Sequence, residues 1–152
     1  MGPEESLKSL GIDLPPPPKP AANYVTSVRL GDLLWTSGHL PAPGEGIRTA
    51  GKLGQDMTVE EGYKAARQAA LAILATVKAA VGSLDGIVRV VKVVCLVNAL
   101  PEFTDHPKVA NGCSDLLAEI LGEPGRGVRS ALGAGSLPNG AAVEIEAVFQ
   151  VR

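Results

Sequence analysis

Aromatic side chains and positive charge are both scarce in this sequence. Phe, Trp and Tyr make up 3% of its 152 residues, and the formal net charge at pH 7 is -2. Proteins that bind nucleic acid without sequence preference stack bases on aromatic side chains and hold phosphates in basic grooves. Because both features are lacking, we expect no nucleic-acid partner.

Cysteine and histidine are scarce as well, with two of each. Cys95 and Cys113 lack the spacing of metal ligands, and His39 and His106 lie far apart in the chain. A zinc site would have to draw on scattered ligands, so we expect neither a metal nor a cofactor. The two cysteines are most simply small, buried hydrophobic residues.

Long apolar runs are also missing. No stretch has the length of a membrane span, and no leader with an apolar h-region opens the chain. We therefore expect a cytoplasmic protein without a membrane partner. The chain is 45% hydrophobic over 152 residues, which is enough to build the core of one domain.

Proline, in contrast, is plentiful, and a run of it extends from Pro15 to Pro18. Consecutive prolines adopt the polyproline II conformation, which has no internal hydrogen bonds. We divide the chain into an extended proline-rich arm, 1–20, and a folded domain, 21–152. The arm either packs against the domain or extends freely into solvent, or it is a ligand for a proline-binding domain. We expect deletion of residues 1–18 to leave the assembly intact.

The first half of the domain predicts a hairpin followed by a helix. Residues 24–38 alternate like two half-buried strands around Gly31-Asp32, and a loop rich in Gly and Pro follows over 39–57. Apolar residues then recur at helical spacing over about 59–81. The capping box that begins at Thr58 and the stop at Gly82 bound this helix.

The second half predicts a strand over 87–98, a helical stripe over 109–121 and a closing pair of strands over 127–152. This order is typical of an α+β fold with one mixed sheet and both helices on one face. Strand 87–98 is apolar on nearly all sides, as central strands are. The face without helices must therefore meet something apolar, most simply another copy of the chain.

The closing strands carry unexpected charges. Glu144 and Glu146 alternate with apolar residues, so both point away from the helix-covered core. A tight hairpin at Asn139-Gly140 would put Arg129, Gly133 and Gly135 on the same face as the glutamates. Arg129 would still lie about 20 Å along its strand from Gly135, the residue that would face Glu144. A joint site would therefore need the arginine of a second subunit.

Two interpretations of these charges stay open. A guanidinium beside glycines, which leave space for a ligand, suits bidentate binding of a planar carboxylate. An intersubunit salt bridge is the alternative.

These residues resemble the YjgF/RidA family, and the resemblance runs from about 22 to 152. The closing motif is fairly specific and consists of Arg129-Ser130, Leu137-Pro138 and Val143-Glu144-Ile145-Glu146-Ala147. The first hairpin is also similar, with Tyr24, Thr36-Ser37-Gly38 and Leu40-Pro41. The proline-rich arm and the segment PKVANGCSDLL look like one branch of the family.

The resemblance implies a chorismate-mutase-like protomer and a homotrimer whose sheets line a central barrel, with three clefts between subunits. It implies hydrolysis of reactive 2-imino or enamine acids to 2-oxoacids and ammonia. Arg129 would hold the carboxylate of the substrate and Glu144 would handle the water. Tyr24, Ser37 and Gly38 would line the cleft. Glycines 133 and 135 complete the predicted binding site.

Three positions depart from the family pattern. Gly127 stands where many members have proline, Ala131 where many have cysteine, and His39 where glutamine is common. His39 is either a catalytic base or a loop histidine at an interface. Two other functions compete with the deaminase: a non-catalytic trimer that binds small carboxylates or a partner protein, and an endoribonuclease. The acidic composition and the lack of a histidine pair argue against the endoribonuclease.

Overall fold

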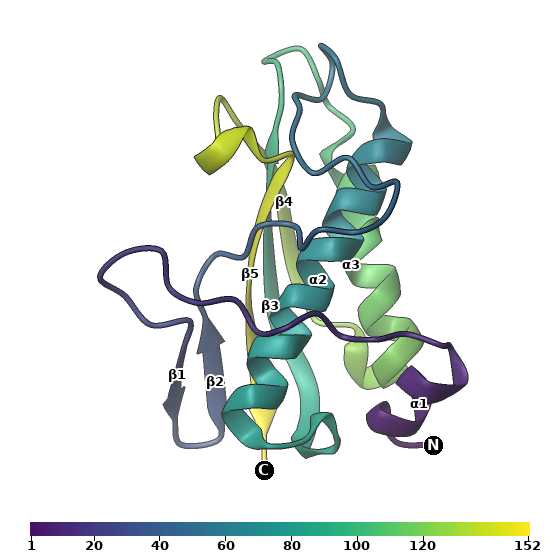
Figure 1. Ribbon diagram of the computed structural model, residues 1–152, viewed down its shortest axis with the longest axis vertical. Coiled ribbons are helices and arrows are strands. Elements are labelled where there is room, and N and C mark those ends of the chain that lie inside the picture. Colours follow the sequence, from purple (N-terminus) through teal and green to yellow (C-terminus); the bar gives the residue numbers. More distant parts are fainter.

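The computed structural model describes residues 1–152, and a five-stranded mixed sheet of order β1-β2-β5-β3-β4 forms its centre. The strands are β1 (Ser27–Leu30), β2 (Leu33–Thr36), β3 (Ile87–Asn98), β4 (Val128–Ala134) and β5 (Val143–Val151). Helices α2 (Val59–Val81) and α3 (His106–Leu121) pack on one face of the sheet (Figure 1). Short 3-10 turns are η1 (Leu84–Gly86), η2 (Glu123–Gly125) and η3 (Pro138–Gly140). The predicted α+β fold is confirmed.

Helix α2 begins and ends as its sequence predicts. The hydroxyl of Thr58 accepts from the amide of Glu61 at 3.1 Å, and the carboxylate of Glu61 accepts from the amide of Thr58 at 3.1 Å. Gly82 ends the helix with a φ of 89°, a conformation that glycine adopts without strain.

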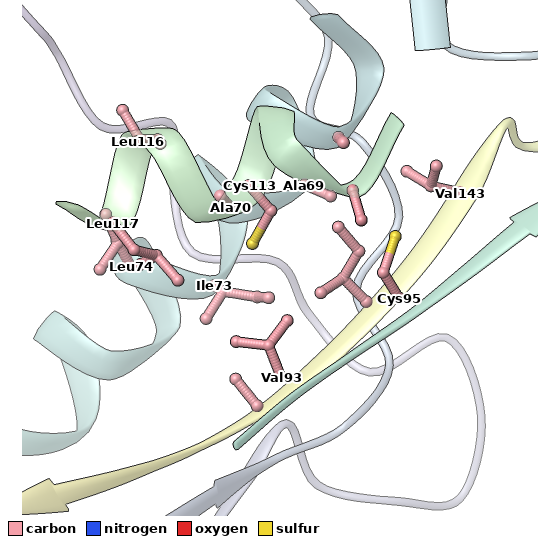
Figure 2. Packing of buried hydrophobic residues seen from close by; sticks show 14 of the residues in the cluster. Ala69, Ala70, Ile73, Leu74, Val93, Cys95, Cys113, Leu116, Leu117 and Val143 are labelled. Carbon is pink, nitrogen blue, oxygen red and sulfur yellow. The ribbon is translucent and has the colours of Figure 1, made fainter. Parts of the chain in front are cut away.

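The core lies between the two long helices and the sheet (Figure 2). Small residues of α2, such as Ala69 and Ala70, are fully buried, which lets this helix lie close to its neighbours. Cys95 and Cys113 are both free and buried, as predicted. Burial raises the pKa of the Cys95 thiol to about 12, and that of Cys113 also rises, so both stay protonated and unreactive.

The predicted closing hairpin is wrong. β4 and β5 do not pair with each other; they lie on either side of β3, β4 parallel to it and β5 antiparallel. The reason is that β3, α3 and β4 form a crossover unit, and a helix that connects two neighbouring strands makes them parallel. Asn139 and Gly140 have positive φ values, but they belong to η3 in the longer connection from β4 to β5.

The arm predicted over 1–20 is not extended throughout. Pro3–Ser9 form a helix, α1, whose Leu7 is 6% exposed and belongs to the core cluster. Glu4 accepts hydrogen bonds from the Lys78 ammonium at 2.9 Å and from the amide of Leu84 at 2.9 Å. These bonds, the Lys78 bond foremost, hold the pKa of Glu4 below its usual value. The docked α1 therefore fixes the start of the arm to the domain.

The second face of the sheet carries no helix. Paired residues form a row across it that reads Val28, Trp35, Val148, Lys92 and Val128. Val28, Trp35 and Val128 are 47%, 49% and 66% exposed. We call this surface the open face. None of the helices combines the length and the apolar character that crossing a bilayer requires.

Candidate functional site

A carboxylate and a glycine come together where the loop after β2 passes over β5. A Cβ on Gly38 would lie 2.8 Å from the carboxyl carbon of Glu144, so any larger residue would push this carboxylate out of its present position. Glu144 pairs with Leu96 of β3 on the open face, as predicted for its side of β5. Its side chain is half-buried and takes part in no hydrogen bond or ion pair. The carboxylate is therefore available to a ligand.

His39 fixes the loop after β2 to strand β5. Its backbone exchanges two hydrogen bonds with Ile145, of 2.7 and 3.0 Å, next to Glu144. Its ring is 3% exposed, and both nitrogens are engaged at 2.7 Å, Nδ1 with the carbonyl of Ser37 and Nε2 with the hydroxyl of Thr76. Since a carbonyl only accepts, Nδ1 carries the proton and Nε2 accepts from Thr76.

Burial lowers the pKa of His39, and the bond to Ser37 opposes this in part. The imidazole is therefore neutral at physiological pH. Because both of its nitrogens already have partners inside the chain, His39 is a structural residue. These contacts favour a structural role for His39 over that of a catalytic base.

Tyr24, Ser37, Gly38 and His39 line one cavity of about 570 Å³. Tyr24 is 46% exposed, and its hydroxyl accepts a hydrogen bond from the amide of Ala21 at 3.2 Å. The structure thus brings together the binding residues predicted from the first hairpin, and one of them, Gly38, lies against Glu144.

Arg129 lies elsewhere. It pairs with Val93 of β3, so its side chain points to the helix-covered face of the sheet, opposite to Glu144. The prediction that the two share a face is wrong, because it depended on the incorrect hairpin register. Nη1 of Arg129 donates to Oδ1 of Asn111 at 2.8 Å and to Oγ of Ser114 at 3.1 Å.

The guanidinium of Arg129 has neutral partners only and forms no ion pair. It lines a second cavity, of about 670 Å³, between α3 and the start of β4. Sequence reasoning missed Asn111 and Ser114. Their spacing of three residues, beside the apolar stripe of α3, was the signal that both face one neighbour.

The two glycines of the predicted binding site are not beside the glutamates. Gly133 pairs with Val97 on the helix-covered side, and a Cβ there would lie 2.7 Å from Nε2 of His106. Gly135 follows the end of β4, and a Cβ there would have no neighbour within 4 Å. Gly133 thus accommodates α3, and Gly135 has no contact that requires glycine.

Within one chain the candidate site is therefore in two halves. Tyr24, Ser37, Gly38 and Glu144 lie around β2 and β5, whereas Arg129 lies on β4 at the far edge of the sheet. No group of three or more His, Cys, Asp or Glu side chains is close enough together to hold a metal ion.

The family model described as "YjgF/chorismate mutase-like, putative endoribonuclease" matches residues 4–145. The chain belongs to the YjgF/RidA family. Among its relatives is Protein TCP17 of Trypanosoma cruzi, which is 46% identical over 96% of this chain and 92% of that protein.

Two solved structures of this family fold are also similar. A protein of unknown function from Agrobacterium tumefaciens is 44% identical, with a TM-score of 0.88, over 99% of this chain and 94% of that one. RidA from an Antarctic Psychrobacter is 25% identical, with a TM-score of 0.61, over 89% of this chain and 94% of that one.

The structure accounts for one departure from the YjgF/RidA pattern. Gly127 lies against β3, where a Cβ would be 2.7 Å from a methyl group of Val90 and 3.0 Å from its carbonyl oxygen. A larger residue would push the start of β4 away from β3. Ala131, the second departure, pairs with Cys95 on the helix-covered face.

Proposed function

We propose that this protein hydrolyses reactive 2-iminoacids to 2-oxoacids and ammonia in clefts between the subunits of a homotrimer. The observation that carries the proposal is the unneutralised guanidinium of Arg129. It is held by Asn111 and Ser114, which orient it without cancelling its charge. A guanidinium held in this way is ready to bind a carboxylate through two parallel hydrogen bonds.

The open face supports the trimer. Trp35 and Val128 are large, apolar and about half exposed or more, and they lie on strands far apart in the sheet. An apolar surface that spans a sheet in this way is typical of an interface. Packing of the open faces around a threefold axis would bring β4 of one subunit to the β1–β2 side of the next. Arg129 would then approach Glu144 of its neighbour.

The proposed reaction needs no cofactor, because an imine is already electrophilic. Arg129 fixes the carboxylate of the substrate and thereby orients the C=N carbon toward one water. Glu144 takes a proton from this water as its oxygen bonds to that carbon. Because the imine is protonated, this addition gives a neutral carbinolamine, whose nitrogen then takes that proton back from Glu144. Glu144 next accepts the hydroxyl proton while the C–N bond breaks, so ammonia leaves as the C=O bond forms, and the remaining proton passes from Glu144 to the ammonia.

The test is the release of ammonia and 2-oxoacid from imines generated freshly in the assay. The wild-type protein should raise the rate above that of spontaneous hydrolysis, and Arg129→Ala should reduce this increment. Lys64→Ala, which changes an exposed lysine of α2, serves as the control. Equal rates with and without wild-type protein, for every imine tried, would refute the deaminase. Binding of 2-oxoacids without turnover would instead support a carboxylate-binding trimer.

A further inference from the structure

The arm forms one wall of the cavity that contains Tyr24, Ser37 and Gly38. Residues 15–19 and Ala21 line it on one side, and residues 40–43 of the loop after β2 line it on the other. Both segments cross α2 in Figure 1, and Ala72 of that helix also lines the cavity. The cavity thus lies between two segments that the sequence places far apart.

The wall is anchored rather than loose. α1 is fixed through Leu7 and Glu4, and Ile12 and Leu14 pack against the core just before the prolines. After the prolines, the hydrogen bond between Ala21 and Tyr24 closes the turn toward β1. Polyproline segments lose little entropy on docking because their conformation is already restricted. The arm can therefore give the cavity a fixed shape.

The lining is mostly apolar. Six of the residues around the cavity are prolines, and Lys19 is the only lysine, arginine or carboxylate among them. Its volume of about 570 Å³ falls in the range of small-molecule sites, which are largely apolar with a few polar groups that orient the ligand. Here the polar side chains include those of Tyr24, Thr26 and Ser37, and Gly38, which also lines the cavity, lies against the carboxyl carbon of Glu144.

We propose that the arm makes this cavity a pocket for the side chain of the substrate, and that the preferred 2-iminoacids carry branched aliphatic or aromatic side chains. This rests on the proposed function. When Arg129 of a neighbouring subunit holds the carboxylate and water attacks beside Glu144, the remaining substituent on the reacting carbon extends into the proline-walled cavity. A small substrate such as 2-aminoacrylate leaves the cavity empty and gains nothing from it.

Ala21→Trp tests the pocket, because Ala21 lines it and is exposed, so a larger side chain fills the cavity without entering the core. Ala22→Trp is the matched control, since Ala22 is exposed and does not line the cavity. The assay compares kcat/KM for the imines generated from leucine and from alanine. Ala21→Trp should lower the value for the leucine-derived imine about tenfold and leave the alanine-derived imine unchanged.

Calorimetric titration with 4-methyl-2-oxopentanoate and pyruvate on the same intact proteins separates this inference from the proposed function. Without turnover of any imine, weaker binding of the longer oxoacid to Ala21→Trp alone would support the pocket and refute the deaminase. Turnover that depends on Arg129 but does not respond to Ala21→Trp, or that falls equally for both imines, would overturn the pocket. An equal effect of Ala22→Trp would overturn it too.

Discussion

At the scale of residues, the two central groups of the candidate site have opposite surroundings. Arg129 is held by two neutral side chains of α3, whereas Glu144 lies against the bare backbone of Gly38. The arginine is therefore oriented by its own chain, and the carboxylate is left free to accept a proton. Substitutions of Arg129 and Glu144 should therefore have different effects.

Arg129→Lys should weaken oxoacid binding and slow hydrolysis nearly as much as Arg129→Ala. An ammonium cannot form the planar two-pronged contact, and loss of a charge-assisted hydrogen bond costs about 1.5–3 kcal/mol, roughly ten- to a hundredfold in affinity. Glu144→Gln should keep oxoacid affinity while hydrolysis falls. Calorimetry and rate measurements on all three variants check this. Equal losses of melting temperature with unchanged affinity would instead identify a structural salt bridge.

The folded protein should lose stability as the pH falls from about 7 to about 5. Burial depresses the pKa of His39, so below its ordinary value of 6.5 the unfolded chain binds more protons than the folded one. The contribution is complete above that value and declines by at most about 1.4 kcal/mol per pH unit below it. His39→Gln should flatten the decline in denaturant titrations. His106→Gln retains His39 and should retain the decline; identical pH profiles for both variants would contradict the argument.

At the scale of elements, α2 and α3 meet at a point where a side chain has no room. A Cβ on Gly112 would lie 2.0 Å from the carbonyl oxygen of Tyr63 in α2, which is backbone and cannot turn aside. Gly62, on the facing helix, would place its Cβ 3.1 Å from methyl groups of Val109, which can adjust. The separation of the two helices therefore depends on Gly112.

Gly112→Ala should lower the free energy of unfolding by about 1–3 kcal/mol, the usual cost of overpacking, despite the better helix propensity of alanine. Gly62→Ala is the control within the same helix pair and should change stability less. Unfolding in urea measures both variants. A more stable Gly112→Ala protein would show that the helices move apart freely.

The sequence predicts elements well where the pattern is local. Residues 59–81 carry a capping box, a periodic stripe and a glycine stop, and α2 has those bounds. The faces of β5 also follow from alternation, with Ile145 and Phe149 buried. β4 has no such pattern, since Val128 and Leu132 are exposed and Ala131 is only half-buried. The pairing of β4 with β3 determines to which side of the sheet each β4 side chain points, and the residues of β4 alone do not predict that pairing.

Helix α1 at the start of the arm could not be predicted either, because its pattern is not local. Pro3–Ser9 are too few for a helical stripe to stand out, and α1 is stabilised by Lys78 and the amide of Leu84, which lie far along the chain. Removal of residues 1–18 would expose the surface that Leu7 and Leu14 cover. We therefore expect the deletion to lower stability, whereas the trimer should persist.

At the scale of the whole molecule, the open face predicts assembly. The chain should sediment as a trimer at micromolar concentration. Val128→Asp should dissociate it, because a charge at a residue that is 66% exposed in one subunit costs little there but a great deal inside an apolar interface. Leu10→Asp alters an exposed leucine outside the open face and should not change the sedimentation. A monomeric wild-type protein would refute the trimer.

The division of the site between the two faces and edges of the sheet has a genetic consequence. Chains that carry Arg129→Ala have an intact Glu144, and chains that carry Glu144→Gln have an intact Arg129. When equal amounts of the two inactive proteins are unfolded together and allowed to reassemble as trimers, about one quarter of the clefts should receive one intact residue from each parent. Two alleles that are each inactive alone would then complement each other in the same cell, which is impossible for a site built within one subunit.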